Sequence, residues 1–257
     1  MAAIVDLAGK RGLVVGIANE HSIAAGCARA LRAAGADLSV TYLNDKAAAF
    51  VTGVAESVDA DLVGPCDVRI PGQLEAVFET LTERWGRLDF LLHSIAFAPR
   101  EDLHTPIINC SAEGFALAMD VSCHSFIRMA KLALPLMTNG GCLMTISFYG
   151  ADKVVENYNL MGPVKAALES SVRYLAADLA SSNIRVHAIS AGPVRTRAAS
   201  GITRFDDLMD EVRERTPARR LVDVEDVGRV AAFLASDASS PLTGSVTYAD
   251  CGFHVMA

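Results

Sequence analysis

The chain has no excess of positive charge, no long apolar run and no paired cysteine motif. Its 257 residues include 23 lysines and arginines against 30 aspartates and glutamates, which argues against nucleic acid as the main partner because phosphate backbones attract basic surfaces. Apolar runs such as residues 126–137 are short and interrupted by charge, so we expect no membrane span. The N-terminal residues lack the basic and apolar segments of a signal peptide.

The six cysteines are scattered along the chain, with neither a CxxC motif nor a zinc-like spacing. We therefore expect free thiols in a reducing cytoplasm and no metal site. With 51% hydrophobic and 21% charged residues, the composition is typical of a globular protein.

Short β-type runs alternate with helical patterns along the whole chain, without repeats or a low-complexity linker. This alternation predicts a single α/β domain over residues 1–257, with a Rossmann-like doubly wound parallel sheet of about seven strands and helices on both faces. Strands are expected at residues 12–16, 36–43, 60–68, 88–96, 141–147, 184–190 and 245–249. Helices are expected at residues 23–34, 72–86, 113–137 and 166–180.

Ligands of such sheets bind beyond the carboxyl ends of the strands, so the loops there are the candidate site. The first loop, residues 16–26, has fewer glycines than a GxGxxG fingerprint. Gly16 would allow a sharp turn, and Ser22 could either meet a pyrophosphate with the following helix or simply cap that helix. Asp67 could likewise accept from an adenine amino group or cap the next turn. Ser94 and Ala96 are small enough for a flat ring to lie close.

The end of the second expected strand bears on the choice of nucleotide. An acidic residue there would bind the adenosine ribose, and an arginine would favour a 2′-phosphate. Leu43 and Asn44 supply neither, although Asp45 and Lys46 follow closely. We therefore predict that NADH is preferred over NADPH.

The stretch from residue 147 to residue 165 contains two Tyr/Lys pairs. Tyr149 and Lys153 are four apart, Tyr158 and Lys165 are seven apart, and both spacings put the pair on one face of a helix. Gly150, Val154 and Val155 are poor helix formers, which assigns the first pair to a loop. The second pair brackets the start of a long helix. Because Pro163 suits only a first turn, that helix either begins after Tyr158 or kinks.

Four segments resemble the bacterial enoyl-[acyl-carrier-protein] reductases of the FabI type, a divergent branch of the short-chain dehydrogenases/reductases. They read SFYGADKVVENYNLMGPVKAALESSVRYLAADL, NIRVHAISAGPVRTRAASGI, HSIAFAP and GIANEHSIAAG. The resemblance extends over nearly the whole chain, to YADCGFHV near its end. Its Tyr-x6-Lys spacing matches Tyr158 and Lys165, whereas ordinary short-chain reductases have Tyr-x3-Lys. The x3 pair is misplaced, and Leu136 stands thirteen residues before it instead of a serine.

The resemblance implies NADH-dependent reduction of the trans-2 double bond of an enoyl thioester, carried by acyl carrier protein, in fatty acid biosynthesis. Tyr158 would donate a hydrogen bond to the thioester carbonyl, and Lys165 would hold the nicotinamide ribose. The implied cofactor contacts are Gly16, Ser22, Ile23, Asp67, Val68, Ser94, Ile95, Lys165, Gly192, Pro193, Val194 and Thr196. The implied acyl pocket comprises Ala96, Phe148, Met161, Ala199, Ile202 and Phe205 beneath a lid at about residues 196–215. A cytoplasmic homotetramer is the family expectation.

Three positions depart from the family pattern. Phe148 stands where the family has tyrosine, Ala96 where it has glycine and Arg197 where it has an aliphatic residue. They suggest an altered substrate or inhibitor profile, or a paralogue acting on another enoyl thioester. Since successive strand side chains point to opposite faces, Phe148 and Tyr149 cannot both face the substrate unless the chain bulges.

Two other functions stay open at this point. One is a short-chain carbonyl or 3-oxoacyl reductase, and the other is a dinucleotide-sensing protein without catalytic activity. Four arginines between positions 213 and 220 could attract an acidic carrier protein. Those at 213 and 215 have a carboxylate three or four positions earlier, whereas Arg219 and Arg220 lack obvious partners and are predicted to dock the carrier.

Overall fold

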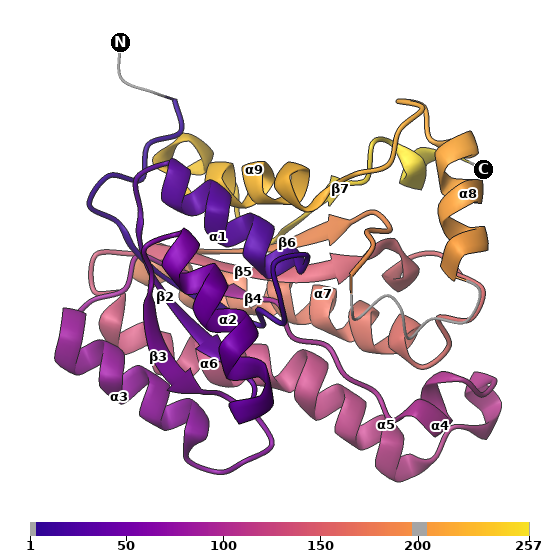
Figure 1. The fold of residues 1–257 in the computed structure, drawn as a ribbon, viewed down its shortest axis with the longest axis horizontal. Coiled ribbons are helices and arrows are strands. Elements are labelled where there is room, and N and C mark those ends of the chain that lie inside the picture. Colours follow the sequence, from indigo (N-terminus) through magenta and orange to yellow (C-terminus); the bar gives the residue numbers. More distant parts are fainter. Residues whose placement is uncertain (1–3, 197–204, 257) are drawn as a thin grey trace.

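The computed structural model describes residues 4–196 and 205–256. In that part of the chain one parallel sheet has the strand order β3-β2-β1-β4-β5-β6-β7 (Figure 1). The order reverses between β1 and β4, which makes the sheet doubly wound, as predicted. The strands are β1 (Arg11–Val15), β2 (Asp37–Tyr42), β3 (Asp61–Pro65), β4 (Phe90–His93), β5 (Gly141–Phe148), β6 (Ile184–Ala191) and β7 (Ser245–Ala249).

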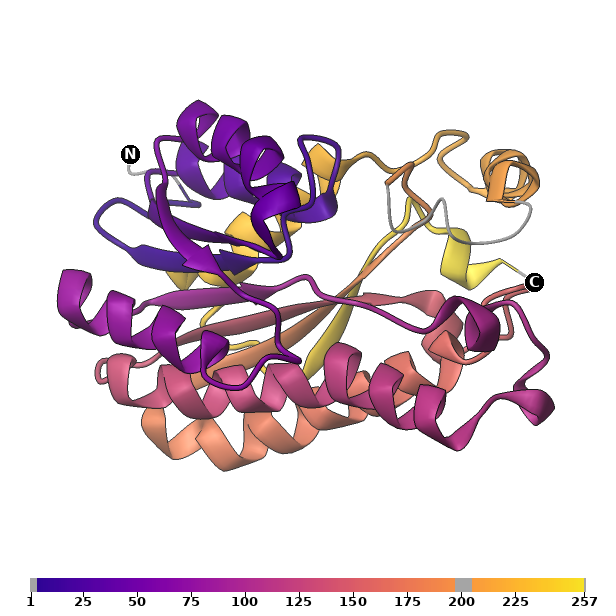
Figure 2. The same ribbon diagram turned by 60° about the horizontal axis from the view of Figure 1, so that its bottom comes forward.

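Helices cover both faces of the sheet (Figure 2). On one face lie α1 (Ile23–Ala33), α2 (Asp45–Ser57) and α9 (Val224–Ala235). On the other face lie α3 (Gln73–Trp85), α5 (Ala112–Met119), α6 (Ser125–Ala133) and α7 (Met161–Leu179). Two further helices, α4 (Arg100–Leu103) and α8 (Phe205–Arg215), lie beyond the carboxyl ends of the strands (Figure 1).

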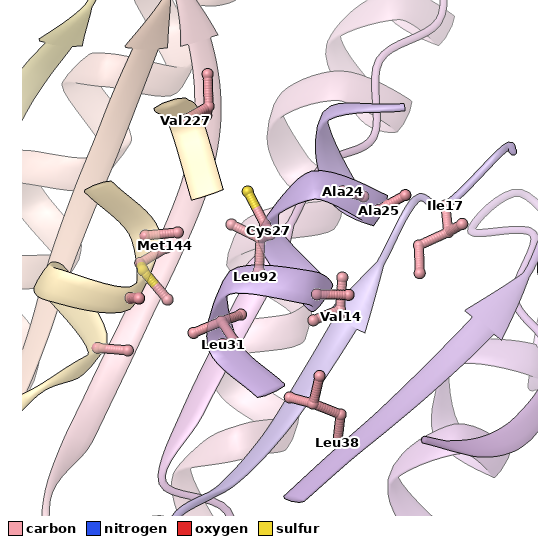
Figure 3. Packing of buried hydrophobic residues seen from close by; sticks show 14 of the residues in the cluster. Val14, Ile17, Ala24, Ala25, Cys27, Leu31, Leu38, Leu92, Met144 and Val227 are labelled. Carbon is pink, nitrogen blue, oxygen red and sulfur yellow. The ribbon is translucent and has the colours of Figure 1, made fainter. Parts of the chain in front are cut away.

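Apolar side chains fill both interfaces between helices and sheet. In Figure 3, Val14 of β1, Leu92 of β4 and Met144 of β5 pack against Leu31 of α1, with Val227 of α9 beside them. All five side chains are fully buried. Strands that are apolar on both faces are typical of a parallel sheet covered on both sides, so the core follows directly from the composition of the strands.

One long helix was predicted at residues 113–137, and the structure confirms it, with helical backbone from Ala112 to Leu136. Helices α5 and α6 are joined through a π-helical turn, Asp120–His124, and a 3₁₀ turn follows at Leu134–Leu136. Such π turns re-aim side chains and recur at functional sites. Here the turn supplies Ser122, whose hydroxyl donates to the carbonyl of Phe97 and accepts from its N–H. The π turn therefore fixes the loop after β4.

The long helix near the second Tyr/Lys pair begins at Met161, three residues after Tyr158. Pro163 falls in its first turn, where a missing N–H costs nothing. Of the two geometries left open, the helix that starts after Tyr158 is therefore the correct one. Helices α2 and α9 were not predicted, although each has a capping residue, Asn44 and Asp223, that accepts a hydrogen bond from the helix N-terminus.

Candidate active site

The loops after β1 and β4 meet at the point where the strand order reverses. Gly16 has φ of 106°, and a Cβ there would lie 2.1 Å from the carbonyl oxygen of Ser94, so only glycine fits. The Ser94 N–H donates to the carbonyl of Val15 at 2.9 Å. Just beyond, Ile23 begins α1, whose free N–H groups lie at this edge. This arrangement fits a pyrophosphate, because a helix N-terminus attracts anions.

Ser22 is the N-cap of α1. Its Oγ accepts from the N–H of Ala25 at 3.3 Å and donates to the carbonyl of Asn19 at 2.7 Å. Of the two roles considered for Ser22, the helix cap is confirmed. Binding of a pyrophosphate by Ser22 stays a prediction. The remaining N–H groups of the first turn of α1 would take part in the same contact.

Asp67, at the end of β3, is held by a residue that the sequence reasoning missed. Arg69 donates to the carboxylate from Nε at 2.9 Å and from Nη2 at 2.6 Å. These hydrogen bonds lower the pKa of Asp67, so the carboxylate stays ionised. Asp67 also accepts from the Arg69 N–H at 3.0 Å, which confirms its turn-capping role. Contact with adenine remains a prediction, and Val68 already accepts a hydrogen bond from Arg128.

The loop after β2 contains the residues that were expected to select the nucleotide. Asn44 caps α2 by accepting from the N–H of Ala47 at 3.2 Å, and its amide oxygen is therefore engaged by the helix. The Leu43 side chain is 48% exposed and carries no charge. Neither side chain offers a cation to a 2′-phosphate, which agrees with the preference for NADH.

The residues expected around the nicotinamide follow β6. Gly192 donates its N–H to the carbonyl of Ala249 at 2.9 Å, and both Gly192 and Pro193 are buried. Val194 packs against the core on the α1 side, and Thr196 is the last described residue before the gap. Ile95 packs against the core on the other face. These residues follow the carboxyl ends of the parallel strands β6 and β4, so they lie at one edge of the sheet.

Tyr158 and Lys165 are both buried, with 8% and 5% of their surfaces exposed. Burial and the nearby charge of Glu169 raise the pKa of Tyr158, which keeps its hydroxyl protonated and able to donate. Lys165 Nζ donates to the carbonyl of Ile146 at 2.7 Å. Burial lowers the pKa of Lys165 to about 8, leaving a cation near neutral pH with donors to spare.

Tyr149 and Lys153 occupy a different environment. Tyr149 starts a 3₁₀ turn, Tyr149–Ala151, so the prediction that this pair belongs to a loop is confirmed. Lys153 Nζ pairs with the carboxylate of Asp152 at 3.3 Å, and its side chain is 63% exposed. An exposed, locally paired lysine is a poor candidate for a cofactor ligand.

Phe148 is the last residue of β5 and packs its ring against Tyr158, with 4.8 Å between ring centroids. Pairing of β5 with β6 is regular up to the Phe148–Ala191 pair, so there is no bulge at this strand end. Tyr149 packs against Phe253, with 5.0 Å between ring centroids, and also edge-on against Phe148 at 5.0 Å. Because Tyr149 already belongs to the 3₁₀ turn after the strand, the alternation expected of an extended strand does not hold at this step.

The remaining residues of the expected acyl pocket are described only in part. Met161 is buried beside Tyr158, and Ala96 is exposed in the loop after β4. Ala199, Ile202 and Arg197 lie outside the described residues, as does the first half of the expected lid. Phe205 begins α8, and its side chain also lies outside the described part.

Two buried polar groups near Lys165 were not foreseen. Ser147 donates to the carboxylate of Glu169 at 2.5 Å, and burial raises the pKa of Glu169. Glu169 lies one helical turn after Lys165, and this i,i+4 spacing was the available signal. His93 is fully buried between Thr145 and Ser125, at 2.8 Å from each hydroxyl. Burial, then the charge of Lys165, lower the pKa of His93 to about 3, so it is neutral.

The prediction that Arg219 and Arg220 lack partners is wrong. Arg219 Nη1 donates to the carbonyl of Glu214 at 2.6 Å, and Arg220 pairs with the carboxylate of Asp226. The chain folds back after α8, and this brings Arg220 to the capping box at the start of α9. The arginines at 213 and 215 pair with Asp210 and Glu211, as expected. All four arginines are therefore engaged within the chain.

A family model described as enoyl-(acyl carrier protein) reductase matches residues 16–254. The chain belongs to this family. An enoyl-[acyl-carrier-protein] reductase [NADH] FabI from Nostoc sp. is 47% identical over 256 residues, which cover 98% of this chain and 99% of that protein. The earlier resemblance to FabI-type reductases is thereby confirmed.

Solved structures of enoyl reductases share the fold. The Anaplasma phagocytophilum enoyl-(acyl-carrier-protein) reductase in complex with NAD has a TM-score of 0.93 and 44% identity, covering 99% of this chain and 97% of that one. The Bacillus cereus enoyl-acyl carrier protein reductase with NADP⁺ and indole naphthyridinone has a TM-score of 0.95 and 41% identity, covering 98% of both chains. Within the described residues of this reductase, no helix is long and apolar enough to span a membrane.

Proposed function

We propose that this chain catalyses the NADH-dependent reduction of the trans-2 double bond of an enoyl thioester in fatty acid biosynthesis. The observation that carries the proposal is the buried pair Tyr158 and Lys165 at the carboxyl edge of the sheet, in a chain of the enoyl reductase family. The names of relatives such as the Nostoc protein specify NADH. Leu43 and Asn44, which offer no charge to a 2′-phosphate, support the same cofactor.

Tyr158 is the residue that would stabilise the transition state. When bound, NADH supplies the hydride that reduces Cβ of the substrate. Negative charge then develops on the thioester oxygen, and a protonated tyrosine aimed at that atom stabilises it as an oxyanion-site donor does. The raised pKa of Tyr158 suits a group that donates a hydrogen bond without losing its proton. A proton from solvent completes the reaction at Cα.

Lys165 would hold the nicotinamide ribose hydroxyls. One of its N–H groups is directed to the carbonyl of Ile146, which fixes the ammonium while leaving two donors. The other cofactor contacts that we propose are those implied by the family resemblance, from Gly16 at the first loop to Thr196 after β6. The glycine contact at Gly16 and the helix N-terminus at Ile23 support the pyrophosphate position.

The acyl group would lie against Phe148, Met161 and the loop at Ala96, below a lid that includes α8. We propose acyl carrier protein as the carrier, because the family is defined by it, but the paired arginines near α8 give no support to docking there. We further propose a single catalytic domain and a homotetramer. All six cysteines are free thiols, which supports work in a reducing cytoplasm.

The proposal is tested by NADH oxidation with paired trans-2-enoyl and 3-oxoacyl thioesters of equal chain length. We expect turnover of the enoyl thioester alone. Tyr158→Phe should lower its rate by roughly 10²–10³-fold, the usual cost of losing one oxyanion donor, whereas Tyr149→Phe serves as the matched control and should stay close to wild type. Turnover of the 3-oxoacyl thioester would indicate a carbonyl reductase, and NADH binding without turnover would indicate a sensing protein.

A further inference from the structure

A continuous series of aromatic contacts joins α8 to Tyr158. Tyr158 packs against Phe148 with 4.8 Å between ring centroids, and Phe148 packs against Tyr149 at 5.0 Å. Tyr149 packs edge-on against Phe253 at 5.0 Å, and the Arg215 guanidinium lies 5.5 Å from the centre of the Phe253 ring. Edge-to-face pairs at such distances are favourable beyond simple burial. Residues from three distant parts of the chain thus form one packed unit.

The inner half of this series is tightly packed. A Cβ placed on Gly150 would lie 2.6 Å from Cδ1 of Tyr158 and 3.2 Å from Cδ1 of Phe148, so the backbone directly contacts both rings on one side. Regular pairing of β5 up to Phe148 fixes the other end. The rings of Phe148 and Tyr158 can therefore shift chiefly toward Tyr149. The residue that packs against Tyr149 thus sets their position.

Phe253 packs against Tyr149, and its position is fixed by burial and by backbone hydrogen bonds. Only 3% of its surface is exposed. It begins a 3₁₀ turn, Phe253–Val255, around which Asp250 accepts from the N–H groups of Gly252 at 3.0 Å and His254 at 2.8 Å. The His254 ring also stacks on Tyr248, 3.8 Å between centroids. The turn thereby fixes the backbone that carries the Phe253 ring.

Helix α8 contacts the same ring through the Arg215 guanidinium. Arg215 pairs with Glu211 one turn earlier, and both charges act on the pKa of Tyr149, which burial raises most. Met209 and Val212 of α8 are buried. The Phe253 ring therefore contacts both α8, through Arg215, and the series that ends at Tyr158.

We propose that Phe253 is a positioning residue for Tyr158, acting through Tyr149 and Phe148, and that it connects α8 to the reacting end of the site. The proposal rests on the proposed role of Tyr158 as the hydrogen-bond donor to the thioester. Without the Phe253 ring, Tyr149 can relax into the vacated space, and the rings of Phe148 and Tyr158 lose their lateral support. The cofactor loops at Gly16 and Asp67 lie on other strands and would keep their geometry.

The test compares Phe253→Ala, Phe253→Leu and wild type. We expect Phe253→Ala to lower kcat on an enoyl thioester by about 10- to 100-fold, because small misplacements of reacting groups have costs of this order. The NADH dissociation constant, measured by its fluorescence, should change less than about twofold, since the loops after β1 and β3 are not involved. Phe253→Leu refills most of the volume and should recover most of kcat.

A double-mutant cycle separates positioning from a general loss of structure. If Phe253 acts through the Tyr158 hydroxyl, Phe253→Ala should cost little further rate in a Tyr158→Phe background. Phe233→Ala on α9, where the ring packs on the opposite core, is the matched control and should leave kcat near wild type. Equal losses from Phe253→Ala in both backgrounds, an unchanged kcat, or a weakened NADH affinity of similar size would overturn the proposal. A mild effect of Tyr158→Phe itself would instead overturn the proposed function.

Discussion

Replacing Lys165 by methionine should destroy activity and yet stabilise the protein near neutral pH. Methionine matches the length and apolar stem of lysine without its charge, so packing is largely kept. Burial lowers the pKa of Lys165 from 10.5 to about 8, which means that the folded state binds this proton less tightly than the unfolded chain does. The charged lysine is therefore a cost to folding that the active site retains for function.

The size and sign of the effect follow from linkage. A shift from 10.5 to about 8 corresponds to roughly 3 kcal/mol of unfolding free energy at 1.4 kcal/mol per pKa unit. This cost is complete below about pH 8 and disappears as the pH rises toward 10.5. Losing the donor to the Ile146 carbonyl costs about 1 kcal/mol at every pH. Lys165→Met should thus be roughly 2 kcal/mol more stable than wild type at pH 7 and about 1 kcal/mol less stable above pH 10.

The measurement is urea unfolding of both proteins at matched concentrations, followed by circular dichroism at intervals from pH 7 to pH 10.5. Equal concentrations matter because any self-association would contribute to apparent stability. Lys153→Met is the control, since the exposed Lys153 side chain should give no pH-dependent difference. A Lys165→Met protein that is less stable at pH 7, by an amount independent of pH, would refute the reasoning. NADH binding should be strongly weakened in this variant alone.

Two other substitutions test the nucleotide and carrier sites. Leu43→Arg should raise the affinity for NADPH by about tenfold relative to NADH, because guanidinium–phosphate pairs are among the stronger ion pairs. Titration of the variant with each nucleotide measures this change. A wild-type protein that binds NADPH more tightly than NADH would contradict the expected preference. Arg220→Glu breaks the pair with Asp226 and should lower turnover of carrier-bound and CoA-bound enoyl substrates in the same proportion. A loss confined to the carrier-bound substrate would reinstate Arg220 as a docking residue.

Local patterns in the sequence determined the doubly wound sheet and the choice between the two Tyr/Lys pairs. Buried strands and amphipathic helices arise from periods of two and 3.6 residues, which a short window reveals. The proline at position 163 could be read in the same way, because its effect on a helix is local. Helices α2 and α9 were missed although their capping residues, Asn44 and Asp223, were available as signals. The π turn at Asp120–His124 was missed because periodicity does not report a single extra residue.

Tertiary structure alone decided which side chains meet. The contact of Glu169 with Ser147 joins α7 to the end of β5 and depends on how the helix packs on the sheet. Arg220 finds Asp226 only after the chain reverses beyond α8. Phe253 contacts Tyr149 across more than a hundred residues of sequence, and the same folding lowers the pKa of Lys165 by removing it from water. The residue types that carry the chemistry can be recognised from short stretches of the sequence. Their partners, burial and charge states depend on chain segments that only folding brings together.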